Sequence, residues 1–289
     1  MIRPIRLLAA LLGFALAIAT ASAEPAIWVV KSGGATVHLF GTIHALKPGT
    51  DWQTPKIEKA FAESEELWLE IADQDPATLR PVMLQLGTDP AHPLSSKLTP
   101  AERAQLDAAA ADAGLGGAAA LEPMRPWLAA VMLGVLPMIK AGYDPREGAD
   151  IVLKAEAEAA HKPVHAFETS AQQMHYFADL PPPIELDFLR STLDELAEGP
   201  AKTTALVQAW QNGDAAGIET LMLELNQEKY RDLYAVLIVA RNRAWAGEIA
   251  KLLQGGDRTI FVAVGAGHLV GPDSLPRALE QLGLHAQRE

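Results

Sequence analysis

Two short apolar runs, each ending in glycine followed three residues later by histidine, limit what this chain can fold into. The first is LFGTIH at residues 39–44, and the second is IFVAVGAGH at 260–268, about 220 residues later. Apolar runs bounded by glycine are typical of buried strands. Open α/β sheets collect their ligands at the carboxyl ends of the strands, where both histidines would lie. The repeated Gly-x-x-His pattern therefore predicts that distant parts of the chain form one site in one sheet.

Residues 1–23 have the pattern of an export signal. Arg3 and Arg6 form a basic start, residues 7–18 are apolar, and ASA at 21–23 fits a small-x-small cleavage site. The apolar run is shorter than the roughly 20 residues that span a bilayer. We therefore expect cleavage near Ala23, a periplasmic or secreted mature protein, and no stable membrane span after cleavage.

The composition excludes several classes of function. Without Arg3 and Arg6 the formal net charge of −12 becomes −14, which argues against nucleic acid or an anionic membrane surface as a partner. The chain has no cysteine, so it has no disulfide, no thiolate metal site and no cysteine nucleophile. About 266 mature residues are enough to form a core without such links.

Strand and helix patterns are distributed unevenly along the mature chain. Five segments have the β-prone composition or the alternation of strands. They are residues 27–31, 36–40, 66–71, 163–169 and 259–264. The rest is mostly helical, including a helix over 127–139 that is apolar nearly all round and is therefore predicted to be buried. We predict one α/β domain over 24–289, with a central mixed sheet from N- and C-terminal strands and a large helical insertion at about 76–253.

Two glutamates end predicted strands. Glu70 follows Leu67-Trp68-Leu69, and Glu168 lies near the end of the strand at 163–169. A carboxylate buried there without a partner would cost stability, so each is either a site residue or a solvated strand end.

Arg241 lies on a long helix that the pattern predicts over about 227–253. It continues the apolar stripe of Leu233 and Leu237, because residues four apart share a helix face. An arginine in such a place usually lies at the edge of a core with its guanidinium in water. The alternative is a buried arginine that pairs with Glu70 and Glu168.

If the predicted strands are parallel neighbours, His44, Glu70, Glu168 and His268 converge on one rim of the sheet. Two imidazoles and a carboxylate suit Zn, Mn, Co or Fe, and such a metal would activate water. Alternatively, Glu70 or Glu168 is a general base and Arg241 stabilises an oxyanion. The sequence has neither a Gly-x-Ser-x-Gly nor a His-Glu-x-x-His motif.

The sequence resembles the TraB/GumN family, which is related to the Tiki metalloproteases and more distantly to erythromycin-esterase-like hydrolases. The resemblance rests on LFGTIH, on LWLE at 67–70, FET at 167–169 and RN at 241–242, and on VGAGHL at 264–269. It implies a divalent metal ion held by His44 and His268 with Glu70. Glu168, Arg241 and Asn242 match further positions of the family.

Together these observations predict an exported, metal-dependent hydrolase, a peptidase acting on a peptide or a small amide or ester. The predicted metal ligands are His44, His268 and Glu70, and the predicted catalytic residues are Glu70, Glu168, Arg241 and Asn242. Two alternatives remain. One is a metal-independent, esterase-like hydrolase in which a His/Glu pair activates water. The other is a non-catalytic protein that binds a peptide, haem or a metal ion.

Overall fold

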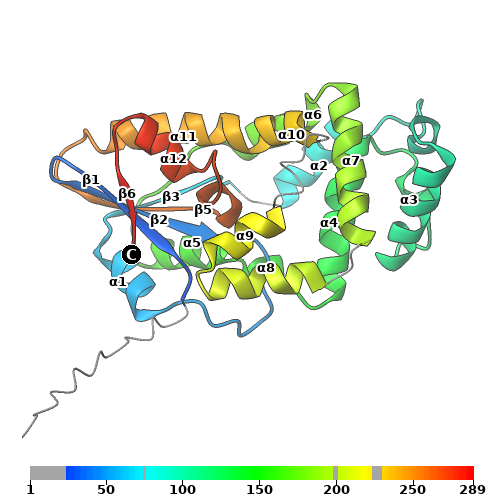
Figure 1. Cartoon of the computed structure of the whole chain (residues 1–289). Coiled ribbons are helices and arrows are strands. Elements are labelled where there is room, and N and C mark those ends of the chain that lie inside the picture. The colour runs from blue at the N-terminus through cyan, green and yellow to red at the C-terminus, as the bar shows by residue number, and fades with distance from the viewer. Residues whose placement is uncertain (1–23, 74–75, 198–200, 223–229) are drawn as a thin grey trace, which may run out of the picture.

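The computed structural model describes residues 24–73, 76–197, 201–222 and 230–289, so the predicted signal segment lies outside the described residues. Its centre is a six-stranded sheet with the strand order β4-β3-β5-β2-β1-β6 (Figure 1). The strands are β1 (Ile27–Ser32), β2 (Ala35–Thr42), β3 (Glu66–Leu69), β4 (Val164–Ala166), β5 (Thr259–Gly265) and β6 (Ala286–Arg288).

Four neighbouring strands are parallel. β1 and β2 form the predicted antiparallel hairpin, while β2 pairs with β5, β5 with β3, and β3 with β4, all in parallel. β5 is inserted between β2 and β3 although it comes last among these strands in the chain. The carboxyl ends of β2, β5, β3 and β4 therefore lie along one edge of the sheet, which confirms the predicted mixed sheet.

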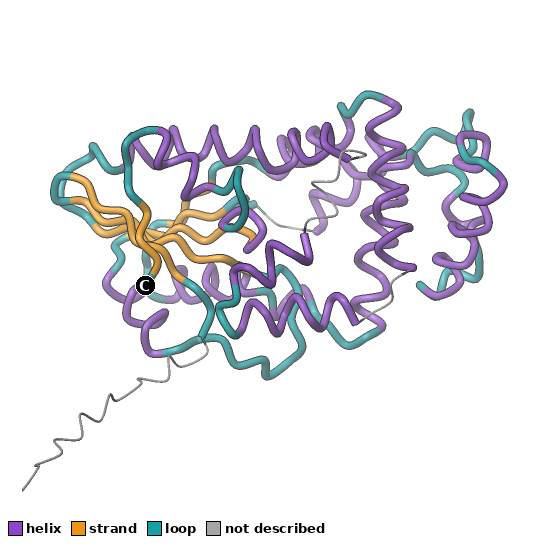
Figure 2. Tube along the Cα trace, in the orientation of Figure 1, coloured by secondary structure: helices purple, strands orange, loops and turns teal. Residues whose placement is uncertain are grey.

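Helices cover both faces of the sheet (Figures 1 and 2). One face packs against α1 (Pro55–Glu63), α5 (Ala149–Ala159), α8 (Ala201–Gln211) and α9 (Ala215–Met222). The other packs against α11 (Ala240–Leu252) and α12 (Leu275–Gln281). The side chains of β5 alternate between the two cores, so this strand is apolar on both sides.

A helical layer lies beyond the carboxyl edge of the sheet (Figure 1). It consists of α2 (Pro76–Gly87), α3 (Pro100–Asp112), α4 (Pro126–Lys140), α6 (Ser170–Ala178) and α7 (Pro182–Ala197), and it has apolar cores of its own. These helices lie within the predicted insertion at 76–253. The insertion is not one continuous helical block, because α5 and β4, which come from the middle of this range, are part of the sheet region.

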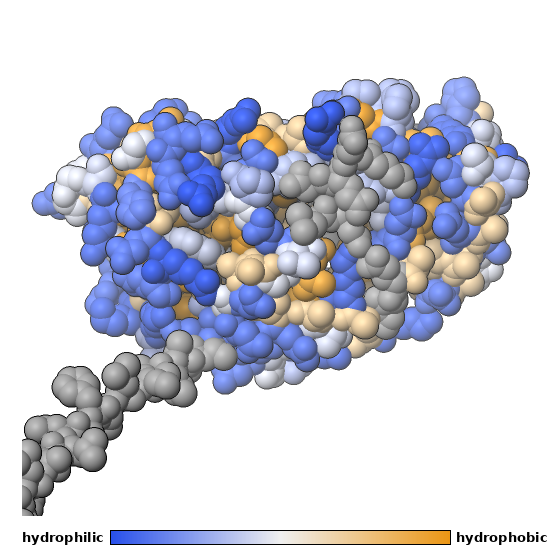
Figure 3. Space-filling view, viewed as in Figure 1, coloured by the Kyte–Doolittle hydropathy of each residue, from blue (hydrophilic) through white to orange (hydrophobic). Residues whose placement is uncertain are grey.

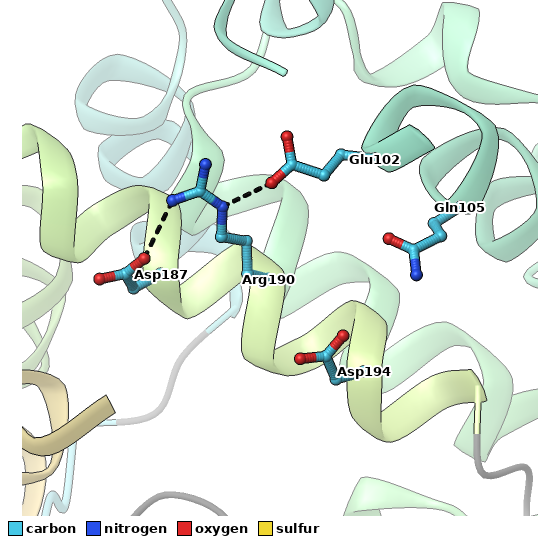
Figure 4. Close-up of a pocket in the computed structure, with 5 residues that line it drawn as sticks. All are labelled: Glu102, Gln105, Asp187, Arg190 and Asp194. Atoms are coloured by element: carbon cyan, nitrogen blue, oxygen red, sulfur yellow. Dashed lines mark hydrogen bonds and ion pairs between the residues drawn. The ribbon is translucent and has the colours of Figure 1, made fainter. Parts of the chain in front are cut away.

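The helical layer contains a cavity of about 410 Å³ (Figure 4). Arg190 lies in it between Glu102 and Asp187, at 2.6 and 3.0 Å from their carboxylate oxygens. Gln105 and Asp194 complete the lining, and none of the predicted site residues takes part.

Two predicted helices differ from the structure. α4 is buried only as far as Leu133, and Val135 and Ile139 are 41% and 48% exposed, so the prediction of a helix buried all round was wrong for its second half. The predicted helix over 227–253 consists of α10 (Arg231–Tyr234), a π-helix (Ala235–Val239) and α11; residues 223–229 lie outside the described residues.

The surface in Figure 3 is mostly hydrophilic, as the acidic composition leads one to expect. Within the described part of the chain, no helix is both long and apolar enough to cross a membrane.

Candidate active site at the carboxyl edge of the sheet

The ends of the four parallel strands bring the predicted residues together. His44 follows β2, Glu70 follows β3, Glu168 follows β4, and His268 lies in the single 3₁₀ turn after β5. A β-carbon on Gly265 would lie 3.1 Å from Glu70 Oε1, 3.3 Å from His44 Nε2 and 3.7 Å from His268 Cδ2. The three groups therefore surround one point, and glycine at this position allows their close approach to the backbone.

One buried arginine pairs with both glutamates. Arg241 Nε donates to Glu168 Oε1 at 2.9 Å, and Nη2 donates to Glu168 Oε2 at 2.9 Å and to Glu70 Oε2 at 2.6 Å. All three side chains are less than 10% exposed. The buried alternative for Arg241 is thus the observed one, and the carboxylates avoid the penalty of unpaired burial.

The other nitrogen of the guanidinium is also occupied. Arg241 Nη1 donates to the carbonyl of Leu237 at 3.2 Å and lies 3.2 Å from His268 Nε2. All five N–H groups of the side chain therefore face acceptors within the protein. The predicted role of Arg241 as an oxyanion donor needs a free N–H group, so this geometry favours a scaffold role instead.

His268 is held in one tautomer. Its Nδ1 lies 2.7 Å from Asn242 Oδ1, and Asn242 Nδ2 donates to the carbonyls of Asp273 and His268 at 2.7 and 3.4 Å. Because the amide nitrogen faces two carbonyls, its oxygen faces the ring and Nδ1 must be the donor. The lone pair of Nε2 then points toward Arg241. Burial lowers the pKa of His268 to about 4, with the charge of Glu70 opposing the shift, so the ring is neutral at pH 7.

Trp245, on α11, contacts Glu168, Arg241 and His268, which we call the buried cluster together with Glu70 and Asn242. Its Nε1 donates to Glu168 Oε1 at 3.0 Å, and its ring lies 4.6 Å from the guanidinium carbon of Arg241 and 4.5 Å from the ring of His268. Trp245 was not among the predicted site residues. Its position four residues after Arg241, on the same helix face, was the available signal.

Glu70 is ionised. Desolvation acts to raise its pKa, but positive charge on His268, Arg241 and His44 and the N–H of Gly265, which donates to Oε1 at 2.7 Å, lower it to about 2. Since His268 is neutral above about pH 4, Arg241 and His44 are the cations that stabilise the Glu70 carboxylate at neutral pH.

His44 is the exposed member of the set. Its side chain is 61% exposed, its Nε2 is directed toward Gly265, and its Nδ1 lies 3.2 Å from Asp150 Oδ1. Desolvation opposes protonation of the ring, but Asp150 and then Glu70 outweigh it and raise the pKa of His44 to about 9. Asp150 was also missed by the sequence analysis, since an acid in the first turn of a helix is common for helix stability alone.

The arrangement does not fit the predicted metal ion as it stands. Arg241 already lies against Glu70 Oε2 and His268 Nε2, two of the atoms that would face a cation. Among the described residues, no three histidine, aspartate or glutamate side chains form a group that could hold a metal.

Comparison with known proteins places the chain in a family. The TraB/PrgY/gumN family model matches residues 26–288. The chain belongs to the TraB/PrgY/gumN family. The curated proteins and the solved structures contain no match. Because one fold can serve several chemistries, the reaction of this family member has to be argued from its site.

Proposed function

We propose that this TraB/PrgY/gumN family member is an exported hydrolase that cleaves a peptide or a similar amide or ester, with His44 and Glu70 as its catalytic residues. The observation that carries the proposal is that His44 Nε2 and Glu70 Oε1 both lie within 3.3 Å of the position that a β-carbon on Gly265 would take, and so lie close to each other at the carboxyl edge of the sheet. We call the space between these two atoms the reaction point. The exposed ring of His44 leaves this point accessible to a substrate. An imidazolium beside a carboxylate is a pairing suited to acid–base catalysis.

In the proposed reaction, Glu70 Oε1 orients a water molecule and accepts one of its protons while the water oxygen attacks the carbonyl carbon. The low pKa of Glu70 makes it a weak base, so proton transfer accompanies the attack rather than preceding it. The His44 imidazolium, protonated at neutral pH, donates its Nε2 proton to the leaving nitrogen or oxygen as the carbonyl–heteroatom bond breaks. The proton on Glu70 then returns to His44, which restores the starting state.

The other predicted residues act in the proposal by positioning these two. Glu168 and Arg241 fix the carboxylate of Glu70, and Asn242 fixes His268 beside it. None of the three has a free group directed at the reaction point, so they are positioning residues rather than catalytic ones.

A metal-dependent peptidase is the second candidate. It is supported by two imidazoles and a carboxylate that surround one point, which is the donor chemistry of zinc and related ions. For this reaction Arg241 would have to move away from Glu70 and His268.

Hydrolysis of a panel of fluorogenic peptides and esters by protein purified without chelator tests both candidates. We expect turnover by the wild type, a loss of about 100-fold or more in His44→Ala and Glu70→Gln, and no effect of EDTA. His175→Ala is the matched control, because His175 is an exposed histidine of α6 that pairs with Asp179, the residue after the end of this helix.

Activity lost on chelation and restored by Mn, Co, Zn or Fe would select the metal-dependent peptidase. Equal turnover by wild type and His44→Ala would contradict both candidates. A peptide or haem retained without product would instead support the non-catalytic binding protein.

A further inference from the structure

Asp150 contacts the side of His44 that faces away from the reaction point. Asp150 Oδ1 lies 3.2 Å from His44 Nδ1, and its side chain is only 10% exposed. The opposite nitrogen, Nε2, is the one directed toward Gly265 and Glu70. The imidazole thus lies between an inner carboxylate on α5 and the reaction point.

Backbone contacts fix the start of α5 against the turn that carries His44. The N–H of Ala149 donates to the carbonyl of Ile43 at 3.0 Å, and Leu46 and Asp144 exchange two backbone hydrogen bonds at 2.8 and 3.3 Å. A β-carbon on Gly148 would lie 2.4 Å from the carbonyl oxygen of His44. Glycine at 148 therefore permits the close approach that places Asp150 beside the ring.

The two histidines of the site are both held through Nδ1, but by partners of different charge. His268 Nδ1 is hydrogen-bonded to the neutral amide oxygen of Asn242, whereas His44 Nδ1 lies within ion-pair distance of the Asp150 carboxylate. A partner at one ring nitrogen determines which nitrogen carries the proton and so what the other nitrogen can do. An amide oxygen accepts a hydrogen bond from the neutral imidazole and does not favour the imidazolium form. A carboxylate can also accept such a bond, and its negative charge favours the imidazolium form.

We propose that Asp150 is the positioning residue of His44: it keeps a proton on Nδ1 and orients the ring so that Nε2 faces the reaction point. The orientation of the His44 ring can be tested even if the protein has no hydrolytic activity. The expected effect of Asp150 on turnover, in contrast, rests on the proposed function. The proposal holds whether water is activated by Glu70 or by a metal, since Nε2 faces the same point in both cases.

The ring orientation is tested by NMR of protein labelled with ¹⁵N-histidine, with the His44 signals assigned by comparison with His44→Ala. We expect Asp150→Ala and Asp150→Asn to shift both ring nitrogens of His44 and to leave those of His268 in place. Asp144→Asn is the matched control, because it makes the same chemical change six residues earlier in the same segment, where Asp144 pairs with Arg146. Unchanged His44 signals in Asp150→Ala, with the thermal unfolding midpoint confirming a folded protein, would overturn the proposal.

The effect on turnover is the second readout. We expect Asp150→Ala to lower kcat about 100-fold with KM within about twofold, because a misoriented ring impairs proton transfer more than binding. A rise in KM with kcat unchanged would contradict the positioning role. A wild-type protein without hydrolytic activity would overturn the proposed function alone, and the ring signals would still decide the role of Asp150.

Discussion

Arg241 balances two buried glutamates with one guanidinium group. Its charge lies between Glu70 and Glu168, while Trp245 stacks on it and the Leu237 carbonyl accepts one of its protons. Lysine could not replace it, because a single ammonium group lacks the planar fork that reaches both carboxylates at once. The arginine is therefore the residue on which the geometry of Glu70 most depends.

Arg241→Leu should lower the free energy of unfolding by about 3–5 kcal/mol, because it leaves two carboxylates buried without their cation. Arg241→Lys should lower it less and should still impair hydrolysis. Urea denaturation monitored by circular dichroism measures the change. Arg277→Leu removes an exposed ion pair with Glu280 and should change stability by less than about 1 kcal/mol. Equal effects of the two leucine variants would contradict this account of Arg241.

Gly265→Ala should reduce both hydrolysis and stability. The new methyl group would lie 3.1 Å from Glu70 Oε1 and 3.3 Å from His44 Nε2, so both groups must move by a few tenths of an ångström. We expect a stability cost of about 1–3 kcal/mol, typical of overpacking, and a loss of activity of about tenfold or more. Gly247→Ala on α11 is the control, since nothing lies within 4 Å of its β-carbon position. Full activity of Gly265→Ala would show that the space is not needed.

At the scale of the elements, α11 is the helix that assembles the site. It supplies Arg241, Asn242 and Trp245, which contact the ends of β3, β4 and β5. The π-helix that precedes it contains Leu237, whose carbonyl accepts from Arg241. π-turns inside helices are frequent at functional sites, and this one ends two residues before Arg241.

Trp245→Phe tests how α11 holds Glu168. Phenylalanine keeps a ring against Arg241 and His268 but removes the N–H donor to Glu168, which should cost about 1.5–3 kcal/mol for a hydrogen bond to a charged group. We also expect activity to fall severalfold. Trp68→Phe removes a similar bond to Glu66, which makes no hydrogen bond to the site residues in the described part of the chain, and should affect stability alone. Loss of activity in both variants would indicate a general effect of destabilisation.

At the scale of the whole molecule, the sheet supplies a rigid edge and the helical layer lies opposite that edge (Figure 1). The titratable groups at this edge have pKa values shifted in different directions. His44 faces Asp150, Glu70 and Arg241, and its pKa is raised to about 9, whereas that of His268 is lowered to about 4. The protein as a whole should therefore have a limited pH range of maximum stability.

We expect stability to be greatest near pH 6.5 and to fall on both sides. The contribution of His44 is complete below its ordinary pKa of 6.5 and is lost as pH rises through about 9. The contribution of neutral His268 is complete above 6.5 and is lost as pH falls toward 4, and that of Glu70 is lost between 4.5 and about 2. Urea midpoints measured from pH 4 to 10 should show this maximum. The alkaline decrease should be smaller in His44→Ala, and an unchanged decrease would assign it to other groups.

Local patterns in the sequence were sufficient to predict β1 to β5, their carboxyl ends, and His44, Glu70, Glu168 and His268 at those ends, whereas the short strand β6 was not predicted. The alternation of apolar and polar residues, the glycine turns and the helix caps involve residues close together in the chain, so these features could be identified from the sequence alone. The π-helix could not be predicted, because its residues also fit an ordinary helix. The exposed end of α4 could not be predicted either, since the sequence of an apolar helix does not show which of its faces packs against another element.

By itself, the sequence determined that two Gly-x-x-His segments end strands of one α/β sheet, because strand formation and glycine turns follow from local residue order. Only the tertiary structure decided that Arg241 faces both glutamates, that Asn242 and Asp150 hold different histidines, and that Trp245 joins the cluster. These contacts join residues as far apart as 171 positions in the chain. Local propensity carries no information about such pairs, which depend on how the strands are ordered and on which helix packs at their ends.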